Sequence, residues 1–271
     1  MKRFYYMIDY HVHTSLCDHA EGGMEAYIQK AVEIGLQDIC FLDHLTMQPA
    51  ADNLSMAPGE VPFYFQALQR LKQEYRGSIN VKIGLEIDFN PDHVDFFQEI
   101  TARYSFDVIG GSLHFLGGLN IASHSSPWKQ GDLEPDYVYD LYLEHLKKML
   151  DYNYFDVLCH LDLVKKFGWE SSRSLDKEFN EILSIIKNKH MTVEINTSGY
   201  NHPAREIYPS FDIIKNCREQ GISITLGSDA HKPENVGQHY DKAWPLLLKA
   251  GYRHLTTFTR RKRSQVAITN T

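Results

Sequence analysis

Residues 4–14 read FYYMIDYHVHT, and the fold assignment rests on the pattern in this stretch. Its first part, Phe4–Tyr10, is apolar and aromatic, as in a buried β-strand, and runs directly into His11 and His13. Since alternate side chains of an extended strand point the same way, both imidazoles can reach one ion while Val12 packs on the other side. A strand that ends in metal-competent side chains is the unit that the rest of the chain repeats.

Seven runs of this kind are expected to form strands. They lie at Phe4–Tyr10, Asp38–Leu42, Asn80–Leu85, Asp107–Leu113, Phe155–Cys159, Thr192–Ile195 and Ser223–Leu226, with a short last strand at Leu255–Phe258. Between them, apolar residues recur at helical spacing, which predicts amphipathic helices. These helices are expected at Met24–Ile34, Phe63–Tyr75, Asp92–Arg103, Asp136–Tyr152, Asp176–Lys189, Phe211–Gln220 and Val236–Ala250.

Alternating strands and helices are typical of βαβ units and a mostly parallel sheet. Glycine follows three of the helices, at Gly35, Gly221 and Gly251, where a helix ends before the next strand. Seven such units predict an α/β fold, a distorted TIM-like (β/α)7 barrel, with an open doubly wound sheet as the alternative. The barrel is favoured because its strands end at one mouth, where functional residues converge. We expect the whole chain, residues 1–271, to form a single domain.

Nine metal-competent side chains stand where such a barrel would bring them together. They are His11, His13, His19, His44, Glu86, His114, His160, Asp229 and His231. Seven imidazoles and two carboxylates are too many for one tetrahedral ion, which takes four ligands, but they suit two or three ions. Imidazole suits zinc, iron, manganese and nickel centres, and a carboxylate can bridge two ions. Clusters of two or more ions are a known apparatus for phosphoester hydrolysis.

Each part of this pattern also has a purely structural interpretation. A single H-x-H or D-x-H is a weak signal, and a histidine at a strand end is more often a hydrogen-bonded polar group than a ligand. Most of the seven predicted strands, however, end in a side chain that binds metals. Independent coincidences do not account for this, so the sequence favours a metal centre.

Eight short motifs follow one another in order along nearly the whole chain. They are H-V-H-T at 11–14, C-D-H-A at 17–20, F-L-D-H at 41–44, G-L-E at 84–86, G-S-L-H at 111–114, C-H-L-D at 159–162, E-I-N-T-S-G at 194–199 and G-S-D-A-H at 227–231. This set resembles the PHP (polymerase and histidinol phosphatase) superfamily. The stretches 160–168 and 206–210 are most similar to its stand-alone histidinol-phosphatase branch. The resemblance implies a PHP-type barrel with a trinuclear metal site that hydrolyses L-histidinol phosphate in histidine biosynthesis.

The resemblance also implies how three divalent ions (zinc, iron or manganese) are shared. The first ion would take His11, His13, Glu86 and Asp229, and Glu86 would bridge to a second ion on His114 and His160. The third ion would take His19, His44 and His231. A metal-bridging hydroxide would attack phosphorus, and Glu86, Asp229 and His231 would be the residues central to catalysis.

The segment that should hold phosphate departs from the pattern of many relatives, which carry a basic pair before a proline after N-T-S-G. Here the residues are Tyr200, Asn201, His202 and Pro203, followed by Arg205. The candidates for substrate or phosphate contact are Arg205, Lys165, Lys166, His202 and, on the long loop 116–135, His124. Cys17 and Cys159 stand beside expected ligands, and packing behind the metal shell is favoured over a redox or nucleophilic role.

Composition excludes several classes of protein. A net charge of −7 disfavours a general nucleic-acid surface, and the RRKR run at 260–263 is better interpreted as a solvated edge or a clamp on the last strand. No apolar run approaches the roughly 18 residues of a membrane span, and the N-terminus lacks an apolar signal region. Four widely spaced cysteines favour free thiols and a cytoplasmic protein. Nothing in the sequence indicates the oligomeric state.

Three other functions compete with histidinol-phosphate hydrolysis. One is a phosphoesterase of different specificity, acting on nucleotides, oligonucleotides or phosphotyrosine. Another is a metal-dependent amidohydrolase, but these enzymes commonly bridge their ions with a carbamylated lysine where this chain has Glu86. The third is a non-enzymatic metal-binding or polymerase-associated module, which the complete set of candidate ligands disfavours.

Overall fold

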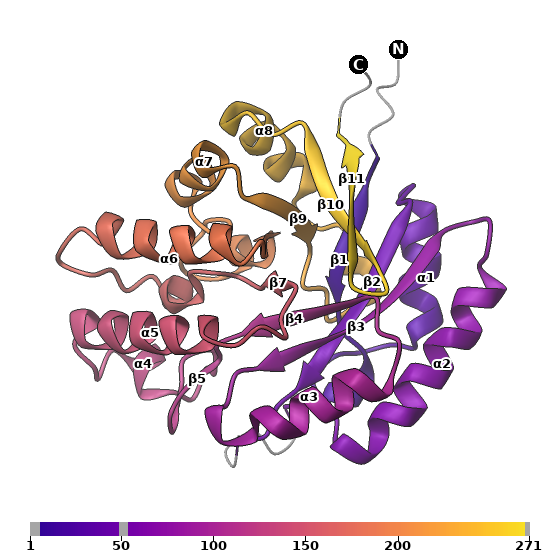
Figure 1. Cartoon of the computed structure of the whole chain (residues 1–271), viewed down its shortest axis with the longest axis horizontal. Helices are drawn as coiled ribbons and strands as arrows, with labels where there is room; N and C mark the ends of the chain where they lie inside the picture. The colour runs from indigo at the N-terminus through magenta and orange to yellow at the C-terminus, as the bar shows by residue number, and fades with distance from the viewer. Residues whose placement is uncertain (1–5, 49–53, 269–271) are drawn as a thin grey trace.

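Seven parallel strands form one sheet in the computed structural model, which describes residues 6–48 and 54–268. They are β1 (Ile8–Val12), β2 (Asp38–Leu45), β3 (Asn80–Asp88), β4 (Val108–Ser112), β7 (Val157–Leu158), β8 (Thr192–Asn196) and β9 (Ser223–Gly227). Their order in the sheet is their order in the chain. A parallel bridge between Val12 and Ala230 joins the ends of β1 and β9, so the sheet forms a nearly closed barrel (Figure 1). The structure therefore confirms the predicted barrel and rejects the alternative, an open doubly wound sheet.

The strand bounds differ from the expected ones in ways that matter for the mouth. β1 begins at Ile8, and the predicted start at Phe4 and Tyr5 lies outside the described residues. β2 and β3 continue beyond their predicted ends, so that His44 and Glu86 lie within the ladder as direct register partners. A backbone ladder holds these two side chains more rigidly than a loop would.

Seven longer helices surround the barrel strands (Figure 1). They are α1 (Met24–Glu33), α2 (Val61–Glu74), α3 (Val94–Arg103), α5 (Pro135–Leu150), α6 (Asp176–Asn188), α7 (Phe211–Gln220) and α8 (Tyr240–Ala250). The predicted start of the last helix at Val236 is wrong. A short 3-10 turn over Pro233–Asn235 precedes it, and His239 has a φ of 58°, which no helix residue can adopt. Gly221 and Gly251 do end their helices in the left-handed region, with φ of 75° and 94°.

The long loop after β4 contains structure of its own. It holds a small hairpin of β5 (Phe115–Leu116) and β6 (Leu119–Asn120) and the short helix α4 (Pro127–Gln130). Trp128 of α4 is fully buried, and its indole N–H donates to the carbonyl oxygen of Val164 at 3.0 Å. This bond ties the loop to the segment that follows β7, beside the barrel mouth.

A second hairpin, β10 (His254–Thr259) with β11 (Lys262–Ala267), lies beside β1 and β9 (Figure 1). Its two-residue turn is Arg260 and Arg261, both with positive φ, as a tight hairpin requires. β11 was not predicted, because its side chains are mostly exposed and give no apolar pattern.

The turn of this hairpin binds the amino-terminal end of the barrel, opposite the mouth. The backbone N–H groups of Arg260 and Arg261 donate to Asp107, directly before β4. The Arg261 guanidinium pairs with Asp156 and donates to the carbonyl oxygen of Tyr154, before β7. Arg260 and Arg261 thus clamp the amino-terminal end of the barrel rather than the last strand, while Lys262 and Arg263 form an exposed edge, so the two interpretations of RRKR each hold for part of the run.

All four cysteines are buried and free of disulfides. Among the described residues, no helix is both long and apolar enough to cross a membrane.

We predict that Arg261→Ala lowers the free energy of unfolding by about 2 kcal/mol, because it removes a charge-assisted bond and leaves the largely buried Asp156 without its cation. Urea denaturation followed by circular dichroism would measure this loss. Lys262→Ala, one residue along and exposed, is the matched control and should change stability little. Equal stability of the two variants would contradict the clamp.

Candidate metal centre

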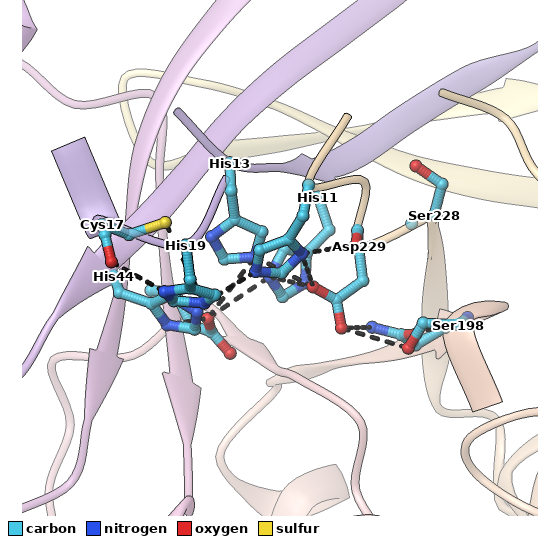
Figure 2. Close-up of polar contacts among 12 residues, drawn as sticks. His11, His13, Cys17, His19, His44, Ser198, Ser228 and Asp229 are labelled. Carbon is cyan, nitrogen blue, oxygen red and sulfur yellow. Dashed lines mark hydrogen bonds and ion pairs between the residues drawn. The ribbon is translucent and has the colours of Figure 1, made fainter. Parts of the chain in front are cut away.

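All nine predicted ligands lie together at the carboxyl-terminal end of the barrel strands. His11, His44 and Glu86 are on β1, β2 and β3. The other six come just after β1, β4, β7 and β9: His13, His19, His114, His160, Asp229 and His231. Figure 2 shows the histidines of the amino-terminal segment and Asp229 directed toward one another, although His11 and Asp229 are 218 positions apart in the chain.

The Glu86 carboxylate lies at the centre of this group and is fully buried. One of its oxygens, Oε1, is 2.8 Å from His160 Nε2, and the other, Oε2, is 2.7 Å from His44 Nδ1. His11 Nε2 is 3.4 Å from Oε2, and His114 Nε2 is 3.8 Å from Oε1. A single carboxylate therefore lies within 4 Å of imidazoles from four different strands.

Asp229 is the second carboxylate of the group. Its Oδ1 is 2.9 Å from His13 Nε2, and its Oδ2 accepts bonds from Asn196 Nδ2 at 3.3 Å and Ser198 Oγ at 3.1 Å. Its φ of 55° places it in the left-handed region, where a residue is held only by surrounding contacts. The D-A-H spacing turns His231 toward His19, with 3.0 Å between their Nε2 atoms.

Among the described residues, six groups of donor atoms have the proximity that one ion needs, and two of them match the expected ligand sets. The donor atoms of His19, His44 and His231 lie within 4.8 Å of one another, and so do those of His11, His13 and Asp229. The first of these groups is the set expected for the third ion, and the second is three of the four ligands expected for the first ion.

Three further carboxylates, which are not themselves predicted ligands, orient the imidazoles by contacting their Nδ1 atoms. Glu194 Oε1 lies 2.6 Å from His11 Nδ1, and Asp43 Oδ1 lies 3.3 Å from His13 Nδ1. Asp88 Oδ1 lies 3.5 Å from His114 Nδ1. Such partners fix the tautomer and the ring orientation of a metal-binding histidine. Sequence reasoning missed this role, and the available signal was a carboxylate inside an apolar strand, such as Glu194 in TVEIN.

Electrostatics hold Glu86 and several of the imidazoles in the protonation state that binds metals, whereas Glu194 beside His11 and Glu86 beside His44 outweigh the effect of burial and raise the pKa of those two imidazoles. Burial would raise the pKa of Glu86, but His44, His11 and His114 hold it well below its usual range. Burial and the neighbouring His44 lower the pKa of His13 to about 3. Similarly, burial together with nearby imidazoles lowers the pKa of His19 to about 4 and that of His231 to about 3. Ionised carboxylates and neutral imidazoles at neutral pH are suitable ligands.

Two buried atoms show that the residues fit divalent ions. His11 Nε2 is buried and makes no hydrogen bond among the described residues, and Glu86 Oε2, 3.4 Å from it, has an ion-pair contact with His44 Nδ1 at 2.7 Å but no hydrogen bond of regular geometry. Buried polar atoms are rarely left without a partner, because such a loss costs about 1–3 kcal/mol. A divalent ion held by these two residues would supply the partner that His11 Nε2 lacks.

A cavity of about 640 Å³ opens over this centre. Three of the five predicted substrate contacts line it, namely Lys166, His202 and His124, together with Ser123 and Ser125 of the long loop. The remaining two do not. Lys165 is paired with Asp162 and Glu206 at 2.8 and 2.6 Å on another face, and Arg205 is exposed outside the cavity lining.

Cys17 and Cys159 pack directly behind the histidines. Cys17 Sγ lies 4.0 Å from His19 Nε2 (Figure 2), and its carbonyl oxygen accepts a bond from His19 Nδ1 at 2.7 Å. Burial raises the pKa of both thiols, which disfavours a nucleophilic thiolate. This placement agrees with the packing role favoured from the sequence.

Comparison with known proteins decides the family. The sequence pattern of the PHP domain matches residues 9–198, which is more than half of the chain. The chain belongs to the PHP domain family. Within this family it is 33% identical to a probable histidinol-phosphatase of Deinococcus radiodurans, over 94% of this chain and 98% of that protein. It is 27% identical to a histidinol-phosphatase of Lactococcus lactis, over 93% and 94% of the two chains.

A solved structure has the same fold. It is the histidinol phosphate phosphatase of Lactococcus lactis, in complex with zinc, L-histidinol and phosphate. The two structures superpose with a TM-score of 0.85 at 25% identity, over 96% of this chain and 99% of that one. The similarity thus extends over the whole barrel, including every strand that contributes to the metal centre.

We predict that Glu194→Gln weakens zinc binding by about 10- to 100-fold, because His11 loses the carboxylate that orients it. Competition with a chromophoric chelator, followed on purified protein, would measure the affinity directly. Glu219→Gln, an exposed change of the same chemistry, is the matched control. Unchanged zinc affinity in Glu194→Gln would contradict the orienting role.

Proposed function

We propose that this chain is a metal-dependent histidinol-phosphatase that converts L-histidinol phosphate to L-histidinol and phosphate in the cytoplasm. The observation that carries the proposal is the combination of a nine-residue centre with a cavity that has Lys166 on its wall. The similarity to two proteins named histidinol-phosphatase, over more than nine tenths of the chain, supports the substrate.

Three ions are proposed, with the ligand sets implied by the family resemblance. The first is held by His11, His13, Glu86 and Asp229, the second by Glu86, His114 and His160, and the third by His19, His44 and His231. The distances of 2.7 to 3.8 Å between Glu86 and four surrounding imidazoles support a bridging position for this carboxylate. When bound, such ions ionise a water molecule near neutral pH and polarise the phosphoryl group.

The protein's own residues bind the phosphoryl group, orient it and neutralise its negative charge. Lys166 lines the cavity, and among the described residues no carboxylate lies within ion-pair distance of it, whereas Lys165 has two such partners. Its Nζ donates to the carbonyl oxygen of Ala122 at 3.0 Å, which holds the side chain in place. A cation held in this way stabilises charge on phosphoryl oxygens without reorganising during the reaction. We propose Lys166 as the phosphate anchor, with His202 and His124 beside it.

The departing alkoxide needs a proton or another stabilising charge. Asp229 and His231 both line the cavity. As an ionised carboxylate and a neutral imidazole that also serve as proposed ligands, they have no proton to donate, so the alkoxide would have to be stabilised by a bound metal ion. Asn196 and Ser198 donate to the outer oxygen of Asp229, which fixes the orientation of the carboxylate. The positioning is thus provided by β8, the strand next to β9 in the sheet.

Phosphate release from a panel of esters tests the proposal. L-histidinol phosphate should be the preferred substrate among phosphomonoesters that include nucleotides and phosphotyrosine. Chelation should abolish activity, and manganese or zinc should restore it. Metal-dependent activity on another ester, with little on L-histidinol phosphate, would assign the chain to a different phosphoesterase specificity. Activity that survives complete metal removal would contradict the metal mechanism.

A pair of variants separates the two candidate phosphate anchors. Lys166→Ala should reduce kcat/KM about 10- to 100-fold, since a charge-assisted bond to phosphate contributes about 1.5–3 kcal/mol. Arg205→Ala should leave kcat/KM nearly unchanged, because Arg205 is outside the cavity lining. The reverse order of effects in steady-state assays would show that Arg205 moves into the site and anchors phosphate.

A further inference from the structure

Asp88 is a carboxylate of the cavity that orients His114 but has no assigned contact with the substrate. Among the described residues that line the cavity, the carboxylates are Asp88 and Asp229. Both oxygens of Asp229 are engaged, by His13 on one side and by Asn196 and Ser198 on the other. Asp88 is 2% exposed and stands at the end of β3, two positions after Glu86 and therefore on the same face of the strand.

The two oxygens of Asp88 have different surroundings. Oδ1 accepts the backbone N–H of His114 at 2.7 Å. Oδ2 has only a long contact of 3.4 Å with the Thr46 hydroxyl. A buried carboxylate oxygen with so weak a partner has unused acceptor capacity, which is costly unless a ligand satisfies it.

The position of Asp88 relative to the proposed ions restricts what it can bind. Its Oδ1 is 3.5 Å from His114 Nδ1, so it lies directly beside a proposed ligand of the second ion. Lys166, the proposed phosphate anchor, follows β7, and β4 separates β7 from β3 in the sheet. The cavity therefore has a cationic group on one wall and an anionic group on another, with the end of β4 and its proposed ligand His114 between them.

We propose that Asp88 selects phosphomonoesters whose alcohol carries an ammonium group close to the ester oxygen, by accepting a charge-assisted hydrogen bond from that ammonium. This inference rests on the proposed function and deepens it. L-Histidinol phosphate has its ammonium on the carbon next to the one that carries the phosphate. An ammonium so placed must be bound beside the metal ligands, where Asp88 stands.

The test compares two esters that differ only in the ammonium: L-histidinol phosphate and 3-(imidazol-4-yl)propyl phosphate. The wild-type protein should prefer the first. Asp88→Asn should reduce the ratio of the two kcat/KM values about 10- to 100-fold, mainly through a higher KM for the amine ester. Any loss of His114 orientation should slow both esters to the same extent, so the ratio of the two kcat/KM values isolates the contact with the ammonium.

Asp43→Asn is the matched control. Asp43 also orients a proposed ligand, His13, but is absent from the cavity lining. This variant should affect both esters equally and leave their ratio unchanged. Metal content and melting temperature are measured for each variant, and Asp88→Ser serves as the second substitution if Asp88→Asn does not fold.

The outcomes separate this inference from the proposed function. If Asp88→Asn slows both esters equally, Asp88 acts only through His114 and the inference is wrong. A wild type that hydrolyses both esters with the same kcat/KM also overturns the inference, while the phosphatase assignment stands. A wild type that hydrolyses neither ester but does hydrolyse other phosphomonoesters overturns the proposed substrate and this inference together.

Discussion

A fully buried negative charge, the Glu86 carboxylate, is the constraint on which the mouth of the barrel depends. Moving an isolated carboxylate out of water is very costly, so the chain must surround it with compensating groups. His44, His160 and His11 do so within 3.4 Å, and each comes from a different part of the chain. Only a closed, parallel barrel brings the ends of those segments to one point. The fold and the metal centre therefore depend on each other.

The opposite end of the barrel must be held for the mouth to keep its geometry. The β10–β11 hairpin does this, since its turn binds Asp107 and Asp156 below β4 and β7. β7 is only two residues long and gains from this support. Above it, the outer carboxylates Glu194 and Asp43 hold the rings of His11 and His13 at a fixed angle. Rigid support on both sides is what a preorganised site requires.

Most of the site could be predicted because a parallel barrel imposes a simple rule on its sequence. Whatever follows a strand lies at the mouth, so His11, Glu86 and His160 were identifiable from strand ends alone. Lys165 and Lys166 show where this rule stops. They are adjacent in sequence and identical in chemistry, yet one pairs with Asp162 and Glu206 while the other lines the cavity. That choice depends on the 3-10 turn over Leu163–Phe167, whose direction no strand pattern specifies.

Strand β11 and the start of α8 were beyond sequence reasoning for similar reasons. β11 pairs through its backbone while its side chains face solvent, so no apolar alternation marks it. The start of α8 depends on the left-handed backbone of His239. Tertiary contacts hold this conformation, so the local sequence pattern does not predict it.

Anomalous diffraction from crystals of the zinc-loaded protein tests the central claim most directly. We predict three zinc peaks at the mouth of the barrel. Two of them should lie on either side of the Glu86 carboxylate, and the third should lie among His19, His44 and His231. A single peak, or peaks that do not contact Glu86, would contradict the bridging role of this carboxylate and the trinuclear centre built around it.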